Sequence, residues 1–317
     1  MELLLTNLTS AVVLAFVLGI VARAVRSDLV IPDQIQTYLS IFLLLAIGLK
    51  GGVALRGQDP GSLALLLVMT LAAGAFTAFS AYAVARFLLG DIRREAAAMA
   101  AHYGSVSAVT FIAASQFAER SGQTPDGVLV ALLVVLEVPA LLIGLALGRS
   151  TQSDAASHHT LKEVFTGKTA ILLLGGLAIG AISGPDGIKK VDAMYFALFQ
   201  GVLMLFMLDM GMTAAGRLAE LRRGWWKLAV FSTALPLAHG VLGVFIADAC
   251  GLSIGGATVF GAMLSSASYI AAPAAVRAGL PEADVGRCIT AALGLTFPFN
   301  LAIGIPLYAS LAQRIAG

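Results

Sequence analysis

Two short stretches of the sequence place polar residues where long apolar runs would otherwise continue. Residues 102–110 read HYGSVSAVT, and residues 264–273 read LSSASYIAAP. A helix that breaks and restarts inside a membrane exposes unpaired amide groups at the start of its second half. The helix dipole adds positive charge there, so two such starts could bind a small anion without Arg or Lys. Serine suits this place because its hydroxyl caps a helix and can donate to an oxyanion.

The alternative is that the small residues only allow helices to pack closely, as they commonly do in membranes. The two stretches lie at matching positions of the two halves of the chain, as described below. This favours discontinuous helices and an anion-binding site over simple packing.

Glu137 is an acidic residue inside an apolar segment, where a charge is costly and is often functional. Carboxylate, hydroxyl and amide oxygens are ligands that small hard cations prefer. Thr110, Glu137, Thr296 and Asn300 could therefore hold Na⁺ beside the anion. The alternative for Glu137 is a buried structural acid, and a structural role is also our interpretation of Asp209.

Composition indicates a membrane protein. Hydrophobic residues make up 59% of the 317 residues, charged residues only 12%, and the mean hydropathy is +0.91. Soluble domains carry about 25% charged residues. The formal net charge of +2 gives no reason to expect a nucleic-acid partner. The sequence also lacks the HExxH, P-loop and GxGxxG patterns, so we expect neither an enzyme nor an organic cofactor.

The apolar residues form about ten runs, each near the roughly 20 residues that a transmembrane helix needs. The predicted spans are residues 8–25, 30–55, 62–89, 95–118, 126–148, 168–184, 191–216, 225–250, 255–278 and 286–313. Fourteen of the 20 Lys and Arg residues lie in the connections on one side, against six on the other. The positive-inside rule makes the first side cytoplasmic and places both termini outside the inner (plasma) membrane.

The two halves of the chain resemble each other in step. Gly48 matches Gly211, Ser105 and Ser107 match Ser266 and Ser268, and Pro139 matches Pro298. Five spans per half is an odd number, so the second half must enter the membrane inverted. We predict a first repeat at 1–148, a cytoplasmic linker at 149–167 and a second repeat at 168–317, an architecture of secondary transporters.

Seven motifs together resemble the sodium-dependent bicarbonate transporters, and the similarity runs over nearly the whole chain. They are IPDQI at 31–35, AIGLKGGVALR at 46–56, GSVS at 104–107, EVPA at 137–140, LDMG at 208–211, SASYIAAPAA at 266–275 and TFPFN at 296–300. The resemblance implies a core domain that slides against a gate domain, Na⁺ as the coupling ion, a homotrimer, and a PII-like regulatory protein on the cytoplasmic face.

The resemblance also implies ligands, which are carried over by matching motif. Bicarbonate would contact Gly104, Ser105, Val106, Ser107, Ala108, Ser266, Ala267, Ser268 and Tyr269. The sodium ligands would be Thr110, Glu137, Ser265 and Asn300. Glu137 stands where members of the family carry Asp, and the central connection is shorter than theirs.

The sequence therefore predicts Na⁺-coupled bicarbonate uptake by an elevator-like movement. The near alternative is a sodium- or proton-coupled symporter of another small anion. A membrane sensor or scaffold protein is the alternative from a different class. In that case the interrupted helices would serve only to pack.

Overall fold

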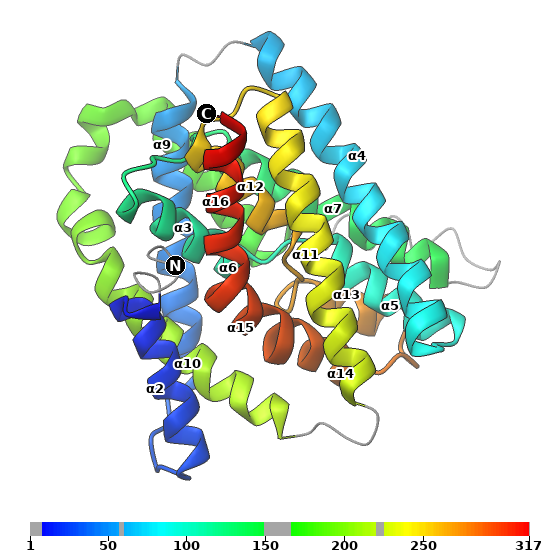
Figure 1. Cartoon of the computed structure of the whole chain (residues 1–317). Helices are drawn as coiled ribbons and strands as arrows, with labels where there is room; N and C mark the ends of the chain where they lie inside the picture. Colours follow the sequence, from blue (N-terminus) through cyan, green and yellow to red (C-terminus); the bar gives the residue numbers. More distant parts are fainter. Residues whose placement is uncertain (1–7, 57–59, 149–165, 220–224, 317) are drawn as a thin grey trace.

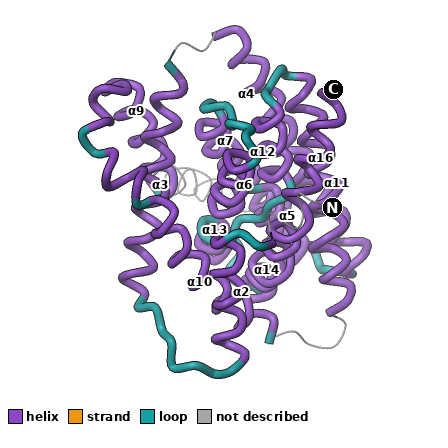
Figure 2. The backbone as a smooth tube through the Cα atoms, turned by 60° about the vertical axis from the view of Figure 1, so that its left-hand side comes forward, coloured by secondary structure: helices purple, strands orange, loops and turns teal. Residues whose placement is uncertain are grey.

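The structure, a computed structural model, describes residues 8–56, 60–148, 166–219 and 225–316. Within these ranges the chain is helical and forms no strand, which confirms the all-α prediction (Figure 2). Helix is expected here because lipid offers no hydrogen-bond partner to an open backbone. The predicted linker at 149–167 lies almost wholly outside the described residues and stays a prediction.

The helices of the two halves follow one another with short connections. The first half contains α2 (Ala11–Ala24), α3 (Asp33–Leu55), α4 (Pro60–Val84), the π-helical turn η1 (Ala85–Leu89), α5 (Arg93–Gly104), α6 (Ala108–Arg120) and α7 (Leu129–Gly148). The second half contains α9 (Lys168–Lys189), η2 (Ala193–Ala197), α10 (Phe199–Leu218), α11 (Trp225–Ala249), α12 (Ile254–Leu264), α13 (Ala272–Gly279), α14 (Val285–Ile289), η3 (Thr290–Thr296), α15 (Phe297–Phe299), η4 (Asn300–Gly304) and α16 (Ile305–Ala316).

Eight helical segments of the described chain are long and apolar enough to cross a membrane. They occupy eight of the ten predicted spans. The other two spans hold shorter apolar helices, which are α2 with 14 residues and α12 with 11 residues. Helix therefore occupies every predicted span, while ten crossings remain a prediction.

The helices pack as two groups. In the first group α3 packs mainly on α9, and α2 packs mainly on α10. The second group contains α4 to α7 and α11 to α16, in which α5 packs on α7 and α11 packs on α12. Figure 1 shows the first group on the left and the second on the right. The groups meet mainly where α10 contacts η3 and where α7 contacts α9.

Glycine allows close approach within the first group. A Cβ atom on Gly48 of α3 would lie 2.9 Å from the Cα atom of Gly176 in α9. A Cβ atom on Gly211 of α10 would lie 3.1 Å from the Cα atom of Gly19 in α2. Gly48 and Gly211, which match each other in the sequence, therefore support the same kind of contact in two different helix pairs.

Both predicted helix interruptions are confirmed. The first separates α5 from α6 at residues 105–107, and the second separates α12 from α13 at residues 265–271. The last predicted span is also irregular, since η3 and η4 insert π-helical turns before α16. Span six runs beyond its predicted end, through a kink at Gly184 where φ is 65°. Glycine adopts such a φ without the strain that a Cβ atom would cause.

Candidate functional site

The first interruption turns the chain from α5 into α6 through extended backbone. Ser105 has φ −88° and ψ 168°, and Ser107 has φ −97° and ψ 114°. The Ser107 hydroxyl accepts a hydrogen bond from the Thr110 amide at 3.2 Å, which satisfies one of the free amides at the start of α6.

The second interruption uses serine in the same way. The Ser268 hydroxyl accepts a hydrogen bond from the Ala272 amide, also at 3.2 Å, where α13 begins. Pro273 lies in the first turn of α13, where a backbone N–H group would have no partner within the helix, so proline costs no helical hydrogen bond there. Ser107 and Ser268 thus each bond an amide at the start of the next helix, although Ser107 directly precedes α6 whereas Ser268 lies three residues before Ala271, the N-cap residue of α13.

The two interruptions meet inside the protein. The Ser107 amide donates to the Ser266 hydroxyl at 2.8 Å, and the Ser268 amide donates to the His102 carbonyl at 2.8 Å. His102 Nδ1 lies 2.7 Å from the Ser268 carbonyl oxygen. Polar residues of two distant parts of the chain therefore form one buried hydrogen-bonded crossover. All four residues are at most 4% exposed.

Several amide groups of this crossover remain without a partner. The amides of Ala108 and Val109 at the start of α6, and those of Tyr269 and Ile270 before α13, have no acceptor within the described residues. Buried amides without acceptors are costly, so their grouping favours a bound acceptor. Two helix starts also bring partial positive charge to the same place. The arrangement is suited to a small oxyanion.

A small pocket opens at the crossover. Five of the predicted anion-site residues line it, together with Glu137 of α7, Thr169 of α9 and neighbouring apolar residues. These five are Val106, Ser107, Ala108, Ser268 and Tyr269. The remaining predicted residues do not line the pocket: Gly104 ends α5, and Ser105, Ser266 and Ala267 lie in the interruptions. Ser266 is engaged instead, because its hydroxyl donates to the Met263 carbonyl and accepts from Ser107.

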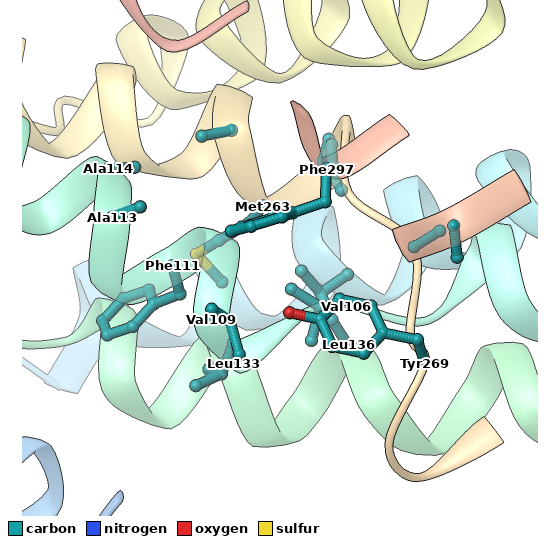
Figure 3. Close-up of a cluster of buried hydrophobic side chains, with 14 of the residues drawn as sticks. Val106, Val109, Phe111, Ala113, Ala114, Leu133, Leu136, Met263, Tyr269 and Phe297 are labelled. Carbon is teal, nitrogen blue, oxygen red and sulfur yellow. The ribbon is translucent and has the colours of Figure 1, made fainter. Parts of the chain in front are cut away.

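Apolar side chains surround the polar groups of the pocket. Val106 and Leu133 line it, and in Figure 3 Val106 and Leu136 lie beside Tyr269, whose ring meets that of Phe297 edge-on at a centroid distance of 6.1 Å. The Tyr269 hydroxyl is buried without a well-formed hydrogen bond in the described part of the chain, although it interacts with Ser107. In such surroundings partial charges are weakly screened, and a bound anion feels them strongly.

The four predicted sodium ligands do not form one cluster. Ser265 and Asn300 bond to each other, since the Ser265 hydroxyl donates to Asn300 Oδ1 and Asn300 Nδ2 donates to the Ser265 carbonyl, both at 2.9 Å. Glu137 lines the pocket beside Ser107 and Ser268, and no hydrogen bond to its carboxylate occurs in the described residues. Thr110 is buried and bonded to Ser107 through its amide.

The buried carboxylate of Glu137, beside hydroxyl groups, could bind a small cation. The side chains of Ser265 and Asn300, by contrast, are already hydrogen-bonded to each other. Thr296, also considered from sequence, is committed elsewhere: its hydroxyl donates to the Ser232 carbonyl and bonds to the Tyr103 hydroxyl, both at 2.7 Å. Of the four predicted sodium ligands, Glu137 is the one that lines the pocket.

Thr169 is a residue of the pocket that sequence reasoning missed. It is the second residue of α9, in the other helix group and the other half of the chain, and no local motif marks it. Thr169 also lines a second small pocket, with Ser40 and Ile112. Ile112 in turn lines a larger groove between α3, α6 and α10. Shared lining residues thus link this α3–α6 groove to the crossover.

Polar side chains bridge the two helix groups across the α3–α6 groove. Lys50 of α3 forms an ion pair with Glu119 of α6, and Gln200 of α10 donates to Gln116 of α6. Asp209, by contrast, bonds within the first group to Gln36 at 2.5 Å. This supports the structural interpretation of Asp209.

Long apolar helices, a buried crossover of two interrupted helices and a polar pocket at that crossover define a multi-pass membrane protein of the transporter class. The sequence profile of the Na⁺-dependent bicarbonate transporter superfamily matches residues 11–313. The chain therefore belongs to this superfamily, as the sequence motifs predicted. A comparison with curated proteins found no match.

Proposed function

We propose that the chain is a secondary transporter that takes up bicarbonate together with Na⁺ and binds the anion in the crossover pocket. The observation that supports this most is the meeting of two helix starts, each bonded by a serine hydroxyl, beside amides that have no acceptor within the described residues. Bicarbonate is small and singly charged. It suits a site of amides and hydroxyls that has no fixed cationic side chain.

Glu137 supports coupling to a cation in this proposal. Its carboxylate lines the same pocket as Ser107 and Ser268, so an anion bound there would be repelled by it. Sodium, when bound at Glu137, supplies the positive charge that offsets this repulsion. Binding of one ion then favours binding of the other, which is what a symporter requires.

An elevator-like movement is the mechanism that we propose. The crossover belongs entirely to the second helix group, which would be the core domain, whereas Thr169 reaches the pocket from the first group, which would be the gate domain. Sliding of the core past the gate would replace the contacts made by Thr169. The α3–α6 groove would be the outer approach to the pocket.

The packing supports two inverted repeats, 1–148 and 168–317. The α3–α9 and α2–α10 contacts are equivalent under such a repeat, and the matching residues Ser107 and Ser268 each bond an amide at a helix start. We further propose a homotrimer in the inner (plasma) membrane, with both termini outside and a PII-like regulator on the cytoplasmic face. These proposals rest on the charge distribution and on the family resemblance.

Uptake of labelled bicarbonate into proteoliposomes tests the function. We expect accumulation with an inward Na⁺ gradient and none above empty liposomes when K⁺ replaces Na⁺. Accumulation driven by an inward proton gradient without Na⁺ would reject Na⁺ coupling in favour of the proton-coupled alternative. No bicarbonate signal under either gradient would reject bicarbonate as the substrate.

The double variant Ser107→Ala with Ser268→Ala separates a carrier from a sensor or scaffold. Loss of hydrogen bonds to a charged ligand should raise the KM for bicarbonate by at least about tenfold. The matched control is Ser310→Ala, which removes a hydroxyl whose one hydrogen bond among the described residues is the one it donates to the Pro306 carbonyl in its own helix. Equal KM values for the double variant and wild type would mean that the crossover does not bind the substrate.

A further inference from the structure

His102 holds one residue of the second interruption at two points. Its carbonyl oxygen accepts the Ser268 amide at 2.8 Å, and its ring nitrogen Nδ1 lies 2.7 Å from the Ser268 carbonyl oxygen. His102 is fully buried near the end of α5, two residues before Gly104. Residues 102 and 268 thus form a reciprocal pair between the two interrupted helices.

The geometry identifies the ring atom that carries the contact. A carbonyl oxygen only accepts, so Nδ1 must carry the proton and donate to Ser268. The other ring nitrogen, Nε2, is buried without a hydrogen-bond partner in the described residues. An apolar side chain of similar volume would fill the space without burying an unpaired nitrogen. Packing alone therefore does not account for an imidazole here.

The bond to Ser268 controls an amide of the proposed site. The Ser268 carbonyl and the Tyr269 amide belong to one planar, trans peptide group, so they point in opposite directions. Holding the carbonyl toward His102 therefore turns the Tyr269 N–H away from His102. That N–H has no acceptor within the described residues, and both Ser268 and Tyr269 line the pocket. A donated hydrogen bond to the carbonyl also polarises the amide of the same peptide.

We infer that His102 is a positioning residue that aims the Tyr269 amide at the bound anion, through the donor at Nδ1. The inference deepens the proposed function and rests on it for the identity of the anion. The orientation of the peptide can be tested without any transport.

Two conservative variants of His102 distinguish the role of Nδ1 from that of Nε2. The side-chain amide of Asn can take the place of Nδ1, whereas that of Gln reaches toward Nε2. We expect His102→Asn to keep the KM for bicarbonate within about twofold of wild type, and His102→Gln and His102→Ala to raise it about tenfold, the effect of an unmade buried hydrogen bond. The limiting rate at saturating bicarbonate should change less than KM.

His239→Ala is the matched control. His239 is also buried in the second helix group, and its Nε2 lies 2.7 Å from the Ser80 hydroxyl, so its loss should lower stability without raising KM. An unchanged KM in His102→Ala would overturn the inference. Rescue by Gln but not by Asn would also overturn it, because Nε2 would then be the working atom.

Hydrogen–deuterium exchange of the peptide that covers residues 266–272 tests the positioning independently of transport. Exchange should be as slow in His102→Asn as in wild type and faster in His102→Gln and His102→Ala. If wild type fails to transport bicarbonate but this pattern holds, the proposed substrate is wrong and the positioning role stands. Equal exchange in all four proteins would refute the positioning role itself.

Discussion

Glu137 places a carboxyl group in the pocket that we assign to an anion. A carboxylate there would serve no purpose for anion binding alone, because it opposes that binding. The Glu137 carboxylate is explained if anion binding depends on a second ion, a cation, bound beside it. At the scale of single residues, we therefore propose that the coupling of the two ions originates at Glu137.

Replacing Glu137 by Gln should uncouple the two ions. Without the carboxylate, the affinity for bicarbonate should be nearly equal with and without Na⁺, whereas wild type and Glu137→Asp should bind bicarbonate more tightly with Na⁺. Binding to the purified protein, titrated in Na⁺ and in K⁺ buffers, measures this. Full Na⁺ dependence in Glu137→Gln would assign the coupling to other residues, such as Ser265 and Asn300.

Sequence reasoning at this scale succeeded where the chemistry is local. The bond that Ser107 makes as the cap of α6 could be predicted, because serine at the start of an interrupted helix has one main use, as a cap. The sodium set was grouped from four separate motifs, and in the structure Glu137 shares a pocket with this serine, while Ser265 and Asn300 bond to each other. Thr169 could not be predicted, because packing between the helix groups brings it to the pocket.

At the scale of helices, two adjacent glycines of α9 provide a matched pair. A Cβ atom on Gly176 would meet α3 backbone at 2.9–3.1 Å, whereas a Cβ atom on Gly175 would have no neighbour within 4 Å. Gly176→Ala should destabilise the protein by about 1–3 kcal/mol through overpacking. Gly175→Ala should be neutral or stabilising by about 0.5–1 kcal/mol, since Ala favours helix.

Thermal unfolding of the two variants in one detergent measures this difference. A lower unfolding temperature for Gly176→Ala than for Gly175→Ala is the expected order. Equal temperatures would show that α3 and α9 do not approach as closely as the structure has them.

The polar bridge across the α3–α6 groove should resist separation of the helix groups. Lys50 and Glu119 are partly exposed, so the pair should contribute only about 0.2–1 kcal/mol. In a variant with Cys at positions 116 and 200, Lys50→Glu should slow cross-linking of the two cysteines up to about fivefold. Adding Glu119→Lys should restore the rate.

The native cysteines are first removed as Cys250→Ser and Cys288→Ala, since both are free thiols. If the cross-linking rate is the same with Lys50 and with Lys50→Glu, the bridge does not hold the two helix groups together.

Helix positions were predictable to within a few residues, because apolar runs between charges define them. The second interruption was predicted, but its length was not. It covers residues 265–271 inside the predicted span 255–278. By contrast, the kink at Gly184 has a sequence signal, because Pro185 follows this glycine, whereas the π-helical turns η3 and η4 have none that is clear. They arise from packing rather than from helix propensity.

At the scale of the whole molecule, the sequence predicted that the fold is made of helices but not which helices pack together. Which helices pair depends on the shapes of their surfaces, so the separation of α2, α3, α9 and α10 from the rest became visible only in the structure (Figure 1). This grouping puts the entire crossover in one body and the start of α9 in the other. The elevator-like movement that we propose needs such a division.

A pair of cryo-electron microscopy maps, with Na⁺ and bicarbonate and with both replaced, tests the central claim most directly. The account predicts an anion-sized feature at the crossover, within hydrogen-bond distance of the Ala108 and Tyr269 amides, that is present only in the first map. It is contradicted if that feature is missing from both maps while bicarbonate density occupies another site.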